Sequence, residues 1–497
     1  MLLLGYDIGS SSIKASIVDT ETGRQIASAQ SPDRELAIQS PKMGWAEQDP
    51  DVWWKHLKIA TGRLLESDKI QKEAITAIGI SYQMHGLVLV DEKRNVLRPS
   101  IIWCDGRAVE TGNELFRGLG EKYSLSHLLN SPGNFTASKL KWVKEYEPDL
   151  FRKAFKFMLP GDYIAMKMTG QISTTVSGLS EAILWDYKKH GLATEVLDAA
   201  GIPERLVPEI LTNFGKHGEL SPEAAAELGL PKGIGLCYRA GDQPNNALSL
   251  NALKPGEVAS TAGTSGVIYG VTDQALYDEK SRVNTFVHVN HNENQQRYGV
   301  LLCINGTGIQ NSWLKNEVFS DQMDYRAMNK EAAAVEVGSD GLTVIPFGNG
   351  PERILQDKDT GAYIGNINFN RHGKAHIIRA AHEGIAFSLC HGLEVMEEMG
   401  MAISSIRAAS SNMYQSKVFR ETLCRCAGVP VELYNTNGAQ GAAIGAGIGA
   451  GIFSDREDAF KGLEKKATVE PDLKRREEYL RAYKHWKSTL NILLRDK

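Results

Sequence analysis

Two hairpins of the same design, one in each half of the sequence, constrain this chain of 497 residues most strongly. In the first, an apolar strand ends at Gly9, three hydroxyl residues form the tip, and a second apolar strand begins at Ile13. The second hairpin has the same three parts, which are Gly256 to Ala262, Gly263-Thr264-Ser265-Gly266 and Val267 to Val271. A repeated supersecondary unit of this kind predicts a duplicated domain with a ligand held between the copies.

The tips of both hairpins carry groups that suit a nucleotide. Glycine and hydroxyl residues present backbone N–H and O–H donors to phosphate oxygens. Asp7, just before the first tip, suits a hydrated magnesium ion better than phosphate itself. The alternative for each tip is an ordinary polar turn. Ser11 to Lys14 also match the S-x-x-K pattern of serine acyl-enzymes, but no K-T-G or S-D-N partner follows. Neither hairpin fits G-x-x-x-x-G-K-[ST], which argues against a P-loop fold.

Length and composition set the class of protein. A chain this long exceeds one hydrophobic core and predicts two large domains, placed here at 1–250 and 251–497. The net charge of −4 gives no electrostatic reason to expect nucleic acid or an anionic membrane as partner. The first residues lack the basic region of a signal peptide, and six scattered cysteines show no zinc or redox spacing. These features favour a cytoplasmic protein with reduced thiols.

Asp242 is the strongest single candidate for a catalytic group. It follows Gly241 after the apolar run Gly233 to Tyr238, which predicts a buried strand with a sharp turn at its end. A rigid sheet can present a carboxylate at such a position to a ligand site. The alternative is a turn or helix-cap residue, which is the commoner role for an aspartate there.

Two further candidates follow predicted strands of the N-terminal half. His85 comes after the strand Ile75 to Ser81, and Asp105 lies in the predicted strand Ile101 to Arg107. Strand ends are where α/β folds build ligand sites, although a lone histidine there is commonly structural and donates to backbone. Other predicted elements are a strand at 87–91, a helix at 51–67 capped by Asp51, mainly helical structure at 113–230, a helix at 380–399 and a strand from Ile406.

Taken together, the motifs resemble those of the FGGY carbohydrate kinases, within the superfamily of sugar kinases, hexokinase, actin and Hsp70. The resemblance runs from Gly5 to about Phe453. It is carried by Gly44-Trp45-Ala46-Glu47-Gln48-Asp49-Pro50 with Trp53-Trp54, Gln83-Met84-His85-Gly86, Arg98-Pro99 with Trp103-Cys104-Asp105-Gly106-Arg107, and Gly263-Thr264-Ser265-Gly266.

The resemblance implies an α/β fold of two ribonuclease-H-like domains of the actin and hexokinase type, with mixed sheets flanked by helices and a cleft between the domains. The N-terminal domain would bind sugar and the C-terminal domain the nucleotide. The implied reaction is ATP-dependent phosphorylation of D-xylulose to D-xylulose 5-phosphate with Mg²⁺. Another ketose or polyol such as ribulose is the alternative substrate, and a non-catalytic sugar- or nucleotide-binding regulator the alternative function. The family also allows a homodimer.

The same resemblance assigns roles to individual residues. Asp242 would be the general base and, with Asp7, would hold Mg²⁺ through water. The sugar would be contacted by Met84, His85, Asp105, Asp242 and Gln243. The nucleotide would be contacted by Ser10, Ser11, Ser12, Lys14, Gly263, Thr264, Ser265, Gly306, Gln310 and Asn412.

Two departures qualify this picture. Gln243 stands where the family usually has asparagine. The adenosine loop, usually a run of three glycines after a strand, is here Ser411-Asn412-Met413-Tyr414-Gln415, whose side chains would restrict how closely backbone approaches adenine. The Gly-rich stretch from Gly438 to Gly451 predicts a helix that packs closely, which we expect on the nucleotide side.

Overall fold

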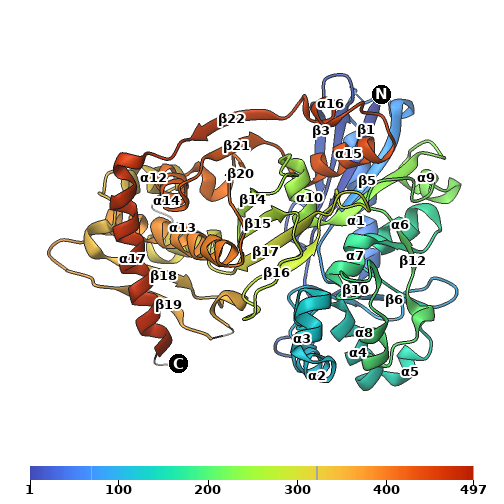
Figure 1. Ribbon diagram of the computed structural model, residues 1–497. Helices are drawn as coiled ribbons and strands as arrows, with labels where there is room; N and C mark the ends of the chain where they lie inside the picture. The colour runs from blue at the N-terminus through green and yellow to red at the C-terminus, as the bar shows by residue number, and fades with distance from the viewer. Residues whose placement is uncertain (69, 321–322, 357, 496–497) are drawn as a thin grey trace.

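The computed structural model describes residues 1–68, 70–320, 323–356 and 358–495, which form two lobes, each built on a mixed β-sheet (Figure 1). The first sheet has the order β3-β2-β1-β5-β13. Strands β1 to β3 are antiparallel, whereas β5 and β13 run parallel to β1. Their bounds are β1 (Leu2–Ile8), β2 (Ile13–Asp19), β3 (Gln25–Ser31), β5 (Ile75–Tyr82) and β13 (Gly235–Gly241).

The second sheet repeats this arrangement. Its central strands have the order β17-β15-β14-β20-β21, with β16 and β22 added at the two edges. The first three are again antiparallel, and β20 and β21 run parallel to β14. The bounds are β14 (Glu257–Ala262), β15 (Gly266–Thr272), β16 (Asn284–Val287), β17 (Tyr298–Ile304), β20 (Ser405–Ala409), β21 (Val431–Asn435) and β22 (Glu464–Val469). The duplication predicted from the hairpins is confirmed, as is the two-domain α/β fold with mixed sheets. The boundary at residue 250 stays a prediction.

The first long helix, α1 (Pro50–Leu65), begins earlier than predicted. Asp51 was expected to cap it, but the cap is Asp49, whose side chain accepts a 3.0 Å hydrogen bond from the Asp51 N–H. Pro50 explains the difference, because proline lacks an N–H and suits the first helical position. The cap therefore lies immediately before the proline.

The predicted strand from Ile101 to Arg107 is also wrong for most of its length. Only β7 (Ser100–Ile101) is extended, paired with β4 (Glu47–Gln48). The chain then turns because the Asp105 carboxylate accepts hydrogen bonds from the Arg107 N–H at 2.9 Å and from the Ala46 N–H at 2.5 Å. The strand predicted at 87–91 is β6 (Val88–Val90).

The region 113–230 is mainly helical, as predicted, with short strands between the helices. Its longer helices are α2 (Val109–Leu119), α4 (Thr136–Tyr146), α6 (Pro160–Thr169), α7 (Val176–Glu181), α8 (Thr194–Ala200) and α9 (Pro222–Leu228). In the second lobe, α13 (Lys374–Glu398) and α14 (Lys417–Ala427) flank the sheet, joined by the terminal helix α17 (Leu473–Arg495).

Two helices link the lobes. Helix α10 (Asp242–Ser249) follows the last strand of the first sheet, and α15 (Gly438–Gly449) follows β21 of the second. Helix α15 packs closely, as predicted, but it returns to the first lobe and lies on β1 and β5; its position on the nucleotide side stays a prediction. Its small residues make this contact close. A Cβ atom at Gly5 or Gly79 would lie only 2.0 Å from the carbonyl oxygen of Ala439 or Ala442.

The edge strand β16 makes a second contact between the lobes. The Thr285 N–H donates to Asn130 Oδ1 at 3.0 Å, and the Thr285 carbonyl accepts from Asn130 Nδ2 at 2.8 Å. The Val287 N–H donates to Ser180 Oγ at 2.8 Å. The first lobe therefore supplies side-chain partners for the backbone groups that β16 turns away from its own sheet.

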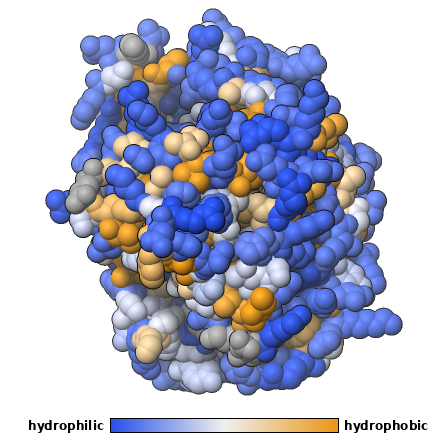
Figure 2. All heavy atoms as spheres, turned by 90° about the vertical axis from the view of Figure 1, so that its left-hand side faces the viewer, coloured by the Kyte–Doolittle hydropathy of each residue, from blue (hydrophilic) through white to orange (hydrophobic). Residues whose placement is uncertain are grey.

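The outer face of the second lobe is mostly hydrophilic, with apolar residues scattered among the charged ones (Figure 2). None of the helices in the described ranges is both long and apolar enough to cross a membrane.

The close approach of α15 to the first sheet gives a stability prediction. Gly79→Ala should lower the free energy of unfolding by about 1–3 kcal/mol, because the new methyl overlaps backbone of α15 that cannot move aside easily. Gly62→Ala is the matched control. Gly62 lies in α1 with no atom within 4 Å of an added Cβ, so alanine should raise stability by about 0.5–1 kcal/mol. Urea denaturation of both variants tests this, and equal effects of the two substitutions would contradict it.

Candidate active site

Asp242 is the first residue of α10, at the point where β13 ends. Its carboxyl is partly exposed, and burial together with the negative charge of Asp7 raises its pKa to about 7. Hydrogen bonds from the backbone and side chain of Gln243 oppose the shift without cancelling it. A carboxyl group with this pKa is suited to accept a proton near neutral pH.

Asp7, at the end of β1, is held from two sides. The Ser81 hydroxyl donates to Asp7 Oδ1 at 2.9 Å, and the other oxygen faces the start of α15, where a Cβ at Gly438 would lie 2.7 Å away. Asn245 of α10 donates to the Gly438 carbonyl oxygen at 2.9 Å. The two acids and the beginnings of both linking helices therefore form one cluster.

The first hairpin tip lies beside these acids. The Gly9 N–H donates to the Ser12 carbonyl at 3.1 Å, which closes the turn. The Ser10 carbonyl accepts from Gln48 Nε2 at 2.7 Å, and the exposed Ser11 accepts from a backbone N–H through its carbonyl. Lys14 is exposed and lies opposite Asp7 in the β1–β2 register.

The second tip is supported by the segment that follows β17. The Ser265 hydroxyl donates to Asn305 Oδ1 at 3.0 Å, and the Gly308 N–H donates to the Gly263 carbonyl at 2.8 Å. Thr264 is exposed at the apex. Asn412 lies close by, since a Cβ at Gly263 would be 3.5 Å from its Nδ2.

The remaining predicted nucleotide residues lie behind the second tip. Gly306 is buried, and a Cβ there would be 1.7 Å from the Pro346 carbonyl oxygen, so its position depends on having no side chain. Gln310 donates to the Ala381 carbonyl at 3.4 Å, and its Oε1 is buried with no hydrogen-bond partner in the described ranges. A direct nucleotide contact of either residue stays a prediction.

The adenosine loop lies next to the second tip. It follows β20, which pairs with β14, and its residues Ser411 and Asn412 are exposed. Asn412 has a φ of 51°, in the left-handed region that glycine adopts most easily. Asn412 thus adopts the backbone conformation that glycine would adopt, and it adds an amide side chain to the loop.

Cys303 of β17 lies close enough to Asp242 to respond to its charge. Burial raises the pKa of the Cys303 thiol well above its usual range, and the charges of Glu352 and Asp242 add to the shift. Strand β17 of the second sheet therefore lies near the acid cluster of the first lobe.

Met84 and His85 lie next to Asp242. A Cβ at Gly241 would be 2.6 Å from Met84 Cγ, so the thioether side chain packs directly on the residue before Asp242. Burial and the nearby charge of Lys139 lower the pKa of His85 to about 3, so its ring is neutral at pH 7. Because His85 Nδ1 lies 3.0 Å from the Glu181 carbonyl oxygen, Nδ1 must carry the proton. Nε2 is then a hydrogen-bond acceptor.

Asp105 differs from the other predicted sugar residues. Its side chain is fully buried, and both oxygens accept hydrogen bonds from Arg107, with Ala46 as a further donor. Arg107 in turn pairs with Glu47 at 2.7 Å and lies over the Trp45 ring at 3.7 Å from its centroid. Asp105 therefore organises the segment around Trp45 and has no exposed oxygen to offer a sugar hydroxyl.

The structure adds residues that the sequence did not single out. Glu181, the last residue of α7, is buried beneath the site, and a Cβ at Gly241 would lie 2.9 Å from its Oε2. Burial raises the pKa of Glu181 well above its usual range, and the charge of Asp242 contributes. Asn245 and Asn305 are the other additions. A lone acid in a predicted helix carries no signal of burial, so the sequence could not have identified Glu181.

Duplicated mixed sheets, a hydroxyl-lined hairpin tip on each and a pair of acids at the start of the linking helices are the kinds of groups that phosphoryl transfer uses. Comparison with known families agrees. Residues 2–249 match the N-terminal domain, and residues 258–452 the C-terminal domain, of the FGGY family of carbohydrate kinases. The chain belongs to this family, whose members transfer a phosphoryl group from ATP to an alcohol group of a carbohydrate.

Individual relatives point the same way. The chain is 30% identical over 412 residues to the xylulose kinase of Bacillus subtilis, covering 81% of this chain and 79% of that protein. It is 27% identical over 461 residues to the xylulose kinase of Escherichia coli, covering 92% and 91%. Among solved structures, the xylulose kinase of Rhodospirillum rubrum superposes with a TM-score of 0.87 at 25% identity, covering 99% of each chain.

The protonation of Glu181 can be tested by substitution. At about pH 4, where both the folded and the unfolded chain hold the Glu181 proton, Glu181→Gln should change the free energy of unfolding by less than about 1 kcal/mol, because the amide has the shape of the neutral acid. Glu181→Ala should cost about 2–4 kcal/mol through the cavity it leaves.

The pH dependence gives an independent check. The folded state keeps the Glu181 proton that the unfolded chain releases above about pH 4.5. Wild type should therefore lose stability relative to Glu181→Gln as the pH rises from there, as followed by urea denaturation. A constant difference between the two proteins across that range would contradict a protonated Glu181.

Proposed function

We propose that this protein phosphorylates D-xylulose at its terminal hydroxyl, giving D-xylulose 5-phosphate, with ATP as donor and Mg²⁺ as the metal ion. The observation that carries the chemistry is Asp242, a carboxyl with a pKa of about 7 at the start of α10, near Asp7. The choice of sugar is supported by the similarity to the curated xylulose kinases over most of the chain. Another ketose, such as ribulose, is the alternative.

Asp242 acts as the general base in this proposal. Its carboxylate accepts the proton of the sugar hydroxyl while the hydroxyl oxygen attacks the terminal phosphorus of ATP, and ADP leaves. The bonds from Gln243 orient the carboxylate. Position matters as much as basicity, because phosphoryl transfer depends chiefly on alignment and charge stabilisation.

The sugar would lie against Met84 and His85. His85 Nε2 can accept a hydrogen bond from a sugar hydroxyl, and the ring is fixed between Phe135 at 4.7 Å and Phe286 at 5.4 Å. Phe286 belongs to β16 of the second lobe, so both lobes contribute to this wall. The apolar Met84 suits the carbon face of a sugar.

The donor set fits a hydrated magnesium ion. Asp7 and Asp242 are two carboxylates whose proximity raises the pKa of Asp242, and a bound cation would relieve that repulsion. No group of three or more metal-binding side chains occurs in the described ranges, which suits an ion held by few carboxylates together with water and phosphate. Mg²⁺ would supply charge neutralisation on the phosphates. The donors at Ser10 to Ser12 and Gly263 to Ser265 would hold those phosphates.

Substitution of Asp242 tests the base. Asp242→Asn should lower kcat for D-xylulose by about 10²–10⁴-fold, because the amide cannot take the proton. D-Xylulose binding, measured by calorimetry, should persist. Asp198→Asn, at an exposed position of α8, is the matched control and should leave kcat unchanged. ADP release across D-xylulose, ribulose and simple polyols identifies the substrate. Full turnover by Asp242→Asn would overturn the base assignment, and a preference for ribulose or a polyol would overturn the choice of sugar.

The pH profile follows from the same group. Below its pKa Asp242 is protonated and cannot accept a proton, so kcat/KM should fall about tenfold per pH unit on the acid side. Bound Mg²⁺ should move the midpoint below about 7, because the cation relieves the repulsion from Asp7. Initial rates at low D-xylulose, with ATP and Mg²⁺ saturating at each pH, measure this limb. A rate that stays flat down to about pH 5 would indicate an ordinary carboxyl pKa instead.

A further inference from the structure

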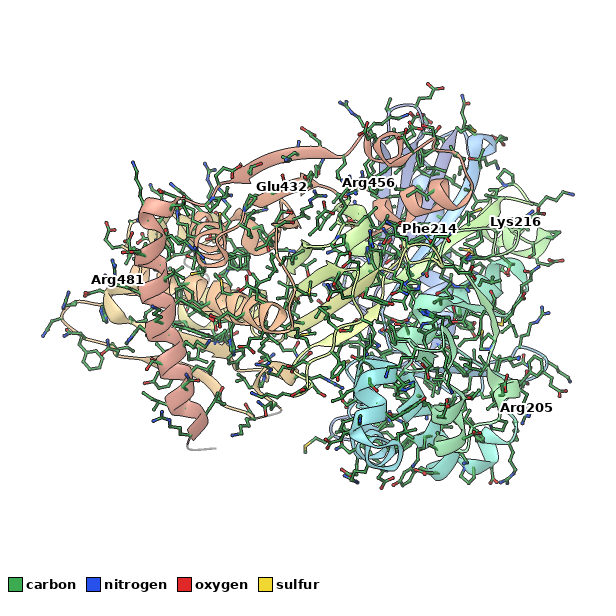
Figure 3. All side chains as sticks on the ribbon, in the orientation of Figure 1. Arg205, Phe214, Lys216, Glu432, Arg456 and Arg481 are labelled. Atoms are coloured by element: carbon green, nitrogen blue, oxygen red, sulfur yellow. The ribbon has the colours of Figure 1, made fainter. Side chains whose placement is uncertain are left out.

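A cavity of about 750 Å³ lies at the junction of the lobes, away from the acid cluster. It is lined by residues from the first lobe, from both linking helices or the chain just after them, and from the loop between β16 and β17. Figure 3 places Phe214 and Arg456, two of its lining residues, at this junction. The volume is that of a small-molecule site.

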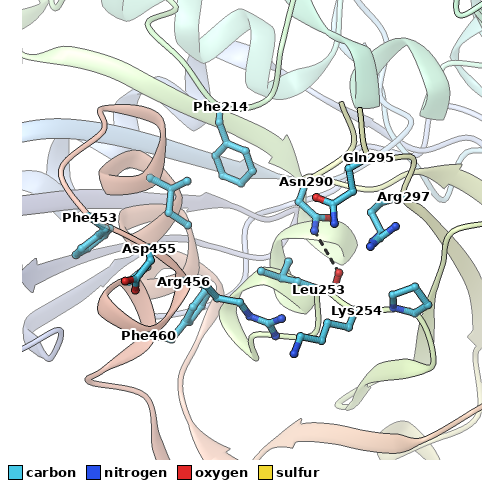
Figure 4. A pocket seen from close by; sticks show the side chains of 13 residues that line it. Phe214, Leu253, Lys254, Asn290, Gln295, Arg297, Phe453, Asp455, Arg456 and Phe460 are labelled. Atoms are coloured by element: carbon cyan, nitrogen blue, oxygen red, sulfur yellow. Dashed lines mark hydrogen bonds between the residues drawn. The ribbon is translucent and has the colours of Figure 1, made fainter. Parts of the chain in front are cut away.

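The lining has an apolar side and a cationic side (Figure 4). The apolar side includes Phe214, Leu253, Ile448 and Phe453. On the other side lie the positive groups of Lys254, Arg297 and Arg456. A ligand that matches both sides has an apolar body and a negatively charged group.

Two of the three cations are available to a ligand. Arg456 is engaged by Asn251, through Oδ1 at 2.5 Å, and by Glu257 at 3.5 Å. Lys254 and Arg297, by contrast, make no ion pair within the described ranges. Arg297 donates through Nη1 to the Gln296 carbonyl at 2.6 Å, and its Nε has no hydrogen-bond partner in the same ranges. A half-buried guanidinium with no carboxylate paired to it favours an anionic ligand.

The acidic residue of the lining, Asp455, forms no ion pair with Lys254 or Arg297 within the described ranges. Asp455 turns its Oδ1 to the Asp458 N–H at 2.9 Å and so caps α16 (Arg456–Phe460). Two unpaired cations are best balanced by a dianion, and a phosphate monoester carries nearly two negative charges at neutral pH.

The linking helices connect this cavity to the acid cluster. Helix α10 begins at Asp242, and Leu253 of the cavity follows its other end. Helix α15 begins at Gly438 beside Asp7, and Ile448 lies near its other end. With a rise of about 1.5 Å per residue, the helices carry each contact over roughly 12–18 Å. A ligand in the cavity touches α15 near its far end and the chain that follows α10.

We propose that this cavity binds a small phosphate monoester with an apolar body, and that its occupancy alters turnover through α10 and α15. The phosphate is held by Arg297 and Lys254, and the body lies against Phe214, Ile448 and Phe453. This site goes beyond the proposed reaction and does not depend on which sugar is the substrate.

Calorimetric titration of the full chain with phenyl phosphate tests the site, with inorganic phosphate and phenol as partial probes. ADP is present throughout so that binding at the nucleotide site is suppressed. Phenyl phosphate should bind with a Kd of about 10 µM to 1 mM, at least about tenfold more tightly than either partial probe. Arg297→Leu should weaken binding by about tenfold or more through loss of the charged contact.

Two further variants complete the design. Ile448→Trp fills the cavity and should abolish binding, whereas Arg326→Leu, on the exposed face of α12 (Tyr325–Ala333), is the matched control and should leave it intact. Thermal melting verifies that each variant is folded. Bound phenyl phosphate should also change kcat or KM of wild type but not of Arg297→Leu. Binding that survives both Arg297→Leu and Ile448→Trp, equal binding of inorganic phosphate, no detectable binding, or unchanged kinetics would overturn the proposal.

Discussion

The contact between α15 and the first sheet is the constraint on which the rest of the site depends. Gly5 and Gly79 let the backbone of α15 approach the strands to a distance that any side chain would prevent. That approach sets Gly438 against Asp7, and the bond from Asn245 to the Gly438 carbonyl then fixes α10 beside α15. Because Asp242 is the first residue of α10, the position of its carboxyl group relative to Asp7 follows from helix packing rather than from a flexible loop.

The acid cluster shows how this packing becomes chemistry. Burial and, after it, the charge of the nearby Asp7 raise the pKa of Asp242, because two carboxyl groups held close together repel each other when both are charged. Glu181 beneath them is a third acid, and its burial raises its pKa well above its usual range. A cation or a proton that binds at this site relieves the electrostatic repulsion between the acids. Phosphoryl transfer supplies both, as the metal ion and as the proton of the attacking hydroxyl.

Much of the fold could be predicted because the residue patterns of strands and hairpins can be recognised within short stretches of sequence. The alternation around Gly9 and Gly263 identified both copies of the repeated unit. The position of Asp242 after a predicted strand and the motif that contains His85 marked these two residues as candidates. Long-range contacts could not be predicted in the same way. The small residues of 438–449 indicated a close helix contact but not which sheet received it, and the burial of Asp105 depends on Ala46, which is 59 residues away. The cap at Asp49 was missed because Asp51 is an equally good acid on composition alone.

The covered edge of β16 affects the tendency of this protein to aggregate at high concentration. An open edge strand is a template on which another chain can add, and it is a common starting point for aggregation. Here Asn130 and Ser180 occupy the outward backbone groups of Thr285 and Val287. The first lobe thus covers the sheet edge of the second. If the two lobes separated, the edge of β16 would be exposed and could pair with another chain. The contact between the lobes therefore helps to keep this protein from aggregating, because it keeps the β16 edge covered.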